Sequence, residues 1–251
     1  MSGHSHWATI RRKKGAADAK RGQIFTRLAR EITIAARDGG GDPSTNLRLQ
    51  YAIDRARAQN MPKDNIERAI KRGTGESKDG LPIEEINYEG YAPHGVAMII
   101  ACVTDNRNRA VADIRHILNR MGGGMADSGS VAWQFTKSAY FSFPSECCDP
   151  DDVFELAVEA GADDVNFDEE TIEIIGPIEV FKEISDRLKE SGINPEEAEL
   201  RMIPNNEIEL SFDDTMQVLK VIENLEELDD VQNVYSNMTI PDEVMARLQV
   251  V

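Results

Sequence analysis

The chain has 251 residues, of which 41% are apolar, and 18 glycines bring it to the composition of a folded globular protein. The longest apolar run, Val96–Val103, is eight residues long, which excludes a membrane-spanning helix of ~20 residues. The net charge is −17, which taken alone argues against binding to phosphate-rich partners.

The charge is unevenly divided along the chain. Residues 1–80 contain 17 Lys and Arg against 9 Asp and Glu, a net charge of +8, whereas residues 81–251 contain 11 against 36, a net charge of −25. This segregation favours contact between the basic part and a polyanion such as nucleic acid, and solvated helix faces are the alternative interpretation.

The first segment of the basic part predicts an arm followed by a helix. Residues 3–15 have no apolar periodicity and contain the basic cluster Arg11–Lys14. No secretory signal is expected because no apolar stretch follows this cluster. Over residues 17–38 apolar side chains recur at helical spacing. At ~100° per residue, Arg30 and Arg37 fall opposite this stripe, where they could meet phosphate.

Two further helices and a linker complete the basic part. The second helix follows Asp42–Ser44 and the third begins at Pro62, with their apolar residues inward and basic residues outside. The segment Gly73–Leu81 is polar and rich in glycine, so we expect a linker there. The helical domain is therefore assigned to residues 1–80.

The acidic part predicts an α+β fold. Strands are expected near 139–143, 165–167, 171–175 and 198–203, and helices near 151–160 and 177–190. This is the ferredoxin-like βαββαβ order, and it fits within residues 138–204.

The flanking segments each contain a strand, a helix and a strand. In residues 81–137 the strands are expected at 96–103 and 131–135, and in residues 205–251 at 207–211 and 231–235. Together these halves predict a second ferredoxin-like domain that the first one interrupts, with a hairpin strand near 85–89 at its edge. A single mixed sheet is the alternative.

A ferredoxin-like sheet invites comparison with RNA-recognition modules, which stack bases on aromatic side chains of the central strands. Here the expected strands present Glu173 and Glu199 instead. We therefore expect acidic sheet faces that repel RNA, and a basic protein as a further partner of the acidic domains.

Catalytic motifs are sparse. The sequence has no phosphate-binding glycine loop and no zinc-ligand spacing, and its three cysteines do not form a disulfide framework. Acidic doublets such as Asp151–Asp152 could hold Mg²⁺ in a nuclease, but neighbouring side chains point to different faces. We expect a cytoplasmic protein in a reducing compartment that is not an enzyme and has no cofactor or metal.

Two further spots could touch nucleic acid. Trp7 lies beside the basic cluster and could stack on a base, or it could anchor the arm on the first helix. The segment Asp105–Arg109 begins an expected helix, where two Asn and two Arg suit a phosphate. The alternative there is a helix cap with ordinary surface arginines.

Long motifs along the chain resemble the YebC/PmpR family. They are Gly3–Trp7, Lys14–Gly22, Ile24–Thr26, Gly39–Pro43, Asn60–Gly73, Tyr88–Tyr91, Thr104–Arg109 and Gly129–Trp133, with weaker similarity from Ala160–Asp164 to the C-terminus. The chain departs from the family pattern at His6, where many members have Lys, at Met125–Asp127 and at Ala110.

The resemblance implies three domains and a cytoplasmic bacterial protein. Family members are commonly described as DNA-binding transcriptional regulators. Relatives include mitochondrial translational activators, and some bacterial members are linked to the ribosome and to translation through proline-rich stretches, so the resemblance leaves DNA and ribosomal RNA open.

We therefore predict a nucleic-acid-binding regulator of gene expression, with DNA as the first target and the ribosome as the alternative. Neither a base-reading element nor an oligomeric state follows from the sequence. The predicted nucleic-acid-binding residues are Trp7, Arg11, Arg12, Lys13, Lys14, Lys20, Arg21, Arg27, Arg30, Arg37, Arg107 and Arg109.

Overall fold

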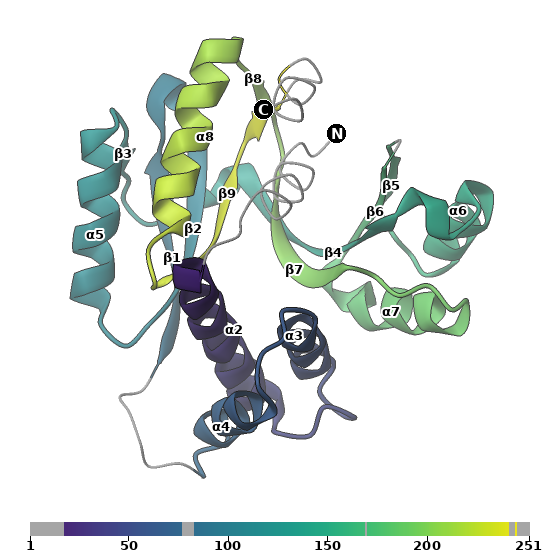
Figure 1. The fold of residues 1–251 in the computed structure, drawn as a ribbon. Coiled ribbons are helices and arrows are strands. Elements are labelled where there is room, and N and C mark those ends of the chain that lie inside the picture. Colours follow the sequence, from purple (N-terminus) through teal and green to yellow (C-terminus); the bar gives the residue numbers. More distant parts are fainter. Residues whose placement is uncertain (1–17, 77–82, 169, 241–243, 245–251) are drawn as a thin grey trace. The chain divides into compact units, whose positions relative to one another are not determined.

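The structure is a computed structural model that describes residues 18–76, 83–168, 170–240 and 244 (Figure 1). It confirms the predicted α+β class, with helices first and antiparallel sheets after them. Within these residues no helix is long and apolar enough to cross a membrane. The predicted arm and most of the linker fall outside the described residues.

The chain forms two compact units. One consists of residues 135–205, and the other of the described residues that come before and after this segment. The second unit contains both the N-terminal helices and the sheet that follows them. The domain boundaries at residues 80, 137 and 204 therefore stay predictions.

Three helices form the N-terminal part, as the periodicity predicts: α2 (Asp18–Gly39), α3 (Leu47–Ala58) and α4 (Lys63–Gly73). Their shared core contains Ile32, Leu49 and Ile66. Asn46 caps α3, because its side-chain oxygen accepts from the backbone N–H of Leu49 at 3.1 Å while its amide donates to two carbonyls at the end of α2.

The sheet of the same unit has the strand order β3-β1-β2-β9, and all neighbours are antiparallel. Its strands are β1 (Glu84–Tyr91), β2 (Ala97–Thr104), β3 (Gly124–Met125) and β9 (Val231–Ser236). Alternate residues of β2, from Met98 to Cys102, face the helices α5 (Arg107–Arg120) and α8 (Phe212–Glu226), which pack against each other.

Two predicted strands of this unit are wrong. Residues 131–135 contain a 3₁₀ turn, Ala132–Gln134, because the buried carboxylate of Glu89 accepts backbone N–H donors here that a strand would offer to its neighbour. Residues 207–211 supply only the short strand β8 (Ile208–Glu209), which pairs with β10 (Met238–Thr239) and not with the main sheet.

The other unit has the predicted βαββαβ order. Its elements are β4 (Phe135–Pro144), α6 (Pro150–Glu159), β5 (Asp164–Phe167), β6 (Thr171–Gly176), α7 (Phe181–Glu190) and β7 (Glu197–Pro204). The antiparallel strand order β5-β6-β4-β7 is that of a ferredoxin-like sheet. Phe141 of β4 stacks on Phe181 of α7, with ring centroids 4.8 Å apart.

The two acidic residues expected on this sheet have partners within the unit. Glu173 is buried and accepts a hydrogen bond from the Tyr140 hydroxyl at 2.7 Å. Glu199 pairs with Arg201 at 3.0 Å, and the Arg201 guanidinium covers the Tyr140 ring at 3.6 Å. Both carboxylates therefore have a partner within the sheet, and Tyr140, which is fully buried, has no exposed ring on which a base could stack.

Candidate nucleic-acid interface

The structure describes the side chains of five of the twelve predicted binding residues. These are Arg27, Arg30, Arg37, Arg107 and Arg109. Trp7 and Arg11–Lys14 lie outside the described residues, and Lys20 and Arg21 lie in the first turn of α2, where only the backbone is described.

Helix α2 is enclosed on two sides at its centre. Ile32 packs against α3 and α4, whereas Ile34 packs with Ile83 and with Val103 of β2. The side of α2 opposite the predicted apolar stripe therefore contacts the sheet part of the same unit. The arginines on that side lie beside protein atoms, where the sequence predicts solvent.

Arg27 and Arg30 of α2 bind the end of α8, the loop behind it and the start of β9. Arg27 donates to the backbone carbonyls of Glu226, at 3.5 Å, and Gln232. Arg30 donates to the carbonyl of Asp229 and forms an ion pair with the Asp230 carboxylate at 3.2 Å. The last carbonyls of a helix have no intrahelical donor and carry partial negative charge, so cations are favoured there.

Asp230 is the centre of this contact. Arg109 of α5 donates two hydrogen bonds to its carboxylate, at 2.8 and 2.9 Å. Arg109 also donates a hydrogen bond to the Asp105 carboxylate at 2.8 Å. The hydrogen bond to Asp230 raises the pKa of Arg109 above its ordinary value, and the hydrogen bond to Asp105 is the second cause of this rise. The bond from Arg109 lowers the pKa of Asp105.

The segment Asp105–Arg109 forms a helix cap. The Asn106 side chain accepts from the backbone N–H of Arg109 at 3.1 Å, which satisfies a donor that a phosphate would otherwise use. Arg107 pairs with Glu84, its Nε lying 2.6 Å from the carboxylate. Asn106 therefore caps α5, and phosphate binding by Arg107 and Arg109 stays a prediction.

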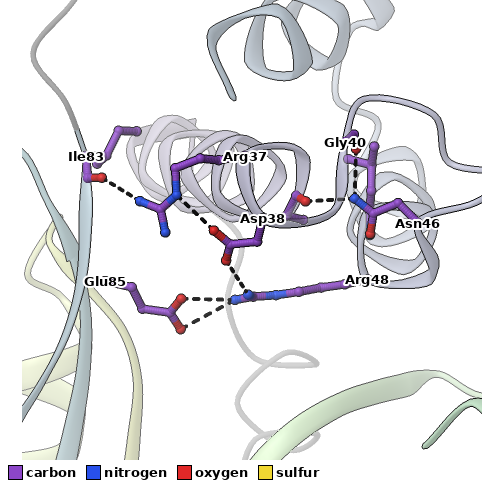
Figure 2. Close-up of polar contacts among 9 residues, drawn as sticks. Arg37, Asp38, Gly40, Asn46, Arg48, Ile83 and Glu85 are labelled. Atoms are coloured by element: carbon purple, nitrogen blue, oxygen red, sulfur yellow. Dashed lines mark hydrogen bonds and ion pairs between the residues drawn. The ribbon is translucent and has the colours of Figure 1, made fainter. Parts of the chain in front are cut away.

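Figure 2 shows the contacts at the other end of α2. Arg37 donates to the carbonyl of Ile83 and to the Asp38 carboxylate, both at 2.9 Å. Arg48 of α3 bridges Asp38 at 3.2 Å and Glu85 of β1 at 3.4 Å. These pairs are about half exposed, so each stabilises by under ~1 kcal/mol.

A cavity of about 240 Å³ lies beside this contact, but its chemistry is unsuited to phosphate. Its lining includes Gln23 and Arg109 together with Asp113, Glu227, Asp229 and Asp230. Four acidic residues and one arginine among the lining residues disfavour an anion.

Two cations outside the predicted set are better placed for phosphate. Arg68 and Lys71 lie on the exposed face of α4 and, among the described residues, form no ion pair. The helical periodicity predicts that both side chains lie on the solvent side of the third helix. The predicted set does not include them because basic residues are more concentrated before residue 38. Nearby, Lys63 pairs with Glu67 only loosely, at 3.5 Å.

Within the described part of the chain, no group of three or more His, Cys, Asp or Glu side chains is arranged to hold a metal ion. The doublet Asp213–Asp214 lies in the first turn of α8, where Ser211 caps the helix by accepting from the backbone N–H of Asp214. Acids at this position complement the helix dipole.

Two family models match the chain. The TACO1/YebC protein N-terminal domain matches residues 5–76, and the TACO1/YebC second and third domain matches residues 83–238.

Full-length relatives are similar as well. A protein of Geotalea uraniireducens is 51% identical over 99% of this chain and 100% of its own length, and one of Acidithiobacillus ferrooxidans is 53% identical over 99% of both. Each carries the name "Probable transcriptional regulatory protein". The crystal structure of a conserved hypothetical protein from Aquifex aeolicus matches with a TM-score of 0.81 and 41% identity, over 89% of this chain and 92% of that one. The chain belongs to the TACO1/YebC family.

Proposed function

We propose that this chain is a cytoplasmic, non-enzymatic regulator of gene expression that binds the phosphate backbone of DNA through its N-terminal part. The observation that carries the proposal is the net charge of +8 on residues 1–80 in a chain of net charge −17. The relatives named as transcriptional regulators support the same function.

The internal pairing of the arginines narrows the set of residues that would meet phosphate. Acceptors within the chain already bind Arg27, Arg30 and Arg109. A phosphate would have to displace these acceptors. We assign the phosphate contacts to Arg11–Lys14, Lys20 and Arg21, with Arg68 and Lys71 of α4 as additional contacts. Trp7 is assigned a stacking role beside the basic cluster.

Contacts of this kind position a protein on nucleic acid without reading its sequence. Each phosphate neutralised by Lys or Arg releases counterions, so the affinity should fall steeply as salt rises. Any preference among DNA sequences would then depend on DNA shape.

The ribosome is the second candidate target, because the same cations can bind ribosomal RNA. One observation favours it: residues 135–205 contain 5 Lys and Arg against 19 Asp and Glu, a net charge of −14. Bare duplex DNA repels such a unit, whereas a ribosome offers basic proteins beside its RNA.

A titration of the full-length protein tests the proposal. Labelled duplex DNA and purified ribosomes are titrated in the same buffer at several salt concentrations. The fourfold variant Arg11→Glu, Arg12→Glu, Lys13→Glu and Lys14→Glu should lose binding. A lost phosphate contact lowers the slope of log affinity against log salt by about 0.9 on duplex DNA.

The matched control carries four reversals elsewhere in the chain. Lys137, Lys182, Lys189 and Lys220 are exposed, and each is changed to Glu. Both variants have the same net charge of −25, so unequal binding isolates the local contacts from the overall field. Equal binding of wild type and the fourfold variant would refute the assignment of residues 11–14.

The two targets and the nuclease alternative give different results. Saturable ribosome binding that survives removal of DNA, beside weak DNA binding, would move the function to translation. Cleavage of the labelled DNA that depends on a divalent metal ion would contradict the non-enzymatic proposal.

A further inference from the structure

Helix α6 of the acidic unit exposes two large apolar side chains on one turn. Phe154 is 53% exposed and Val158 is 56% exposed. Residues four apart on a helix are neighbours on its surface, so the two side chains form a single apolar spot. Val153 and Ala157 face the core of the unit, so this spot is not part of the packing that holds α6 in place.

Carboxylates border the apolar spot. At ~100° per residue, Asp151 and Glu155 lie about 60° and 100° around the helix from Phe154. Asp151, Asp152 and Glu155 are exposed and, within the described part of the chain, none of them forms an ion pair. By contrast, Glu159 at the end of the helix is paired with Arg187 at 3.0 Å.

The charge of the whole unit restricts what can cover this face. With a net charge of −14 over residues 135–205, the unit repels nucleic acid, anionic lipid and a second copy of itself. A basic segment is attracted instead, and an apolar side chain on that segment can cover Phe154 and Val158.

We infer that the exposed face of α6 is a docking surface for a partner protein that presents a basic amphipathic helix. In such a complex an apolar side chain of the partner packs on Phe154 and Val158, and its lysines or arginines pair with Asp151 and Glu155. Apolar burial supplies most of the affinity, and the charge pairs set the approach and the register. This surface does not depend on the nucleic-acid proposal, which can fail its own test separately.

Two peptides serve as probes. The first is about 18 residues of Leu and Lys patterned to form an amphipathic helix of five turns. The second has the same composition in a scrambled order without a helical apolar face. Binding of each peptide to the full-length protein is measured by calorimetry at several salt concentrations.

Two variants separate the apolar and charged parts of the surface. Phe154→Ser with Val158→Ser should weaken binding of the patterned peptide by about tenfold or more. Trp133→Ala, which removes an exposed apolar side chain outside α6, is its control and should leave binding unchanged.

The charge variant is Asp151→Asn, Asp152→Asn and Glu155→Gln, which should weaken binding and flatten its salt dependence. Its control has the same net charge through Glu179→Gln, Asp186→Asn and Glu190→Gln, at exposed positions beside and on α7. Circular dichroism checks that every variant keeps the wild-type fold.

The expected pattern is tight binding of the patterned peptide, weaker binding of the scrambled one, and losses only in the two α6 variants. Equal binding of both peptides would show attraction by charge alone and would overturn the inference. So would the absence of binding, or an apolar variant that binds as wild type does. Self-association that Phe154→Ser with Val158→Ser abolishes would assign the face to a second copy instead.

Discussion

Arg30 of α2 and Asp230, two hundred residues later in the chain, form an ion pair in which both side chains are largely buried. The two charged groups lie 3.2 Å apart, with 16% of the Arg30 side chain and 6% of the Asp230 side chain exposed. Arg109 of α5 binds the same carboxylate. One aspartate thus joins the N-terminal helices to the sheet part of their unit.

Replacing Asp230 by Asn should lower the free energy of unfolding by about 3 kcal/mol. The substitution leaves the largely buried Arg30 without its counter-charge, and breaking such a pair is far more costly than losing an exposed one. Urea unfolding measures the change. Asp229→Asn is the control, since the Asp229 side chain is exposed and only its backbone carbonyl bonds Arg30. Similar losses in both variants would contradict the central position of Asp230.

Measurements of stability and of the salt dependence of nucleic-acid binding should distinguish the arginines that stabilise the fold from the cations that bind phosphate. Arg30→Gln should reduce stability and leave the salt dependence of nucleic-acid binding unchanged. Arg68→Gln and Lys71→Gln should leave stability within ~0.5 kcal/mol and lower the salt slope by about one each. An Arg30 variant that loses affinity at full stability would restore Arg30 to the phosphate-binding set.

Much of the fold follows from local periodicity. Helices α2 to α4 and the βαββαβ unit appear in the sequence because each carries an apolar pattern of its own period. The error at residues 131–135 arises because Val131 and Phe135 read as a strand, whereas the donors of that segment go to Glu89 more than forty residues earlier. No local pattern contains that partner.

The candidate site was harder to predict for the same reason. The density of basic residues shows that cations are present, but it does not show which acceptors they meet. The acceptors of Arg27 and Arg30 lie in residues 226–232, about two hundred positions away. Three of those acceptors are backbone carbonyls, which leave no signal in composition or charge.

Glu89 should give the fold an acid-sensitive anchor. Burial disfavours its charged form, but the backbone N–H groups of Gly129, Val131 and Ala132, at 2.6, 2.6 and 2.9 Å, together outweigh burial and lower its pKa. A carboxylate with a lowered folded-state pKa contributes stability above its unfolded-state pKa of about 4.3 and loses it as the pH falls through the folded-state value.

Glu89→Gln should therefore reduce stability by about 2 kcal/mol at neutral pH, because the new amide turns a donor toward N–H donors. The difference in the free energy of unfolding between wild type and variant should disappear as the pH falls below about 4. Urea unfolding of both proteins across this pH range measures the difference. Glu85→Gln on the same strand is the control and should cost under ~0.5 kcal/mol, since Glu85 is exposed. A constant gap down to the lowest pH would contradict the role of the charge.

Replacing Gly73 and Gly22 of the helical part by alanine should change the free energy of unfolding in opposite directions. At Gly73, where α4 crosses α2, a Cβ atom would overlap the carbonyl oxygen of Thr33 and lie 2.8 Å from the Cβ of Ala36. The helices would have to separate, so Gly73→Ala should destabilise by about 1–3 kcal/mol.

Gly22 lies in the first half of α2, and a Cβ there would meet no atom within 4 Å. Gly22→Ala should stabilise the protein by about 0.5–1 kcal/mol, because alanine loses less backbone entropy in a helix. Thermal and urea unfolding of the two variants in parallel measure both effects. If Gly73→Ala were as stable as wild type, α2 and α4 could not approach as closely as the contact at Thr33 requires, and the packing of the helical part would have to be redrawn.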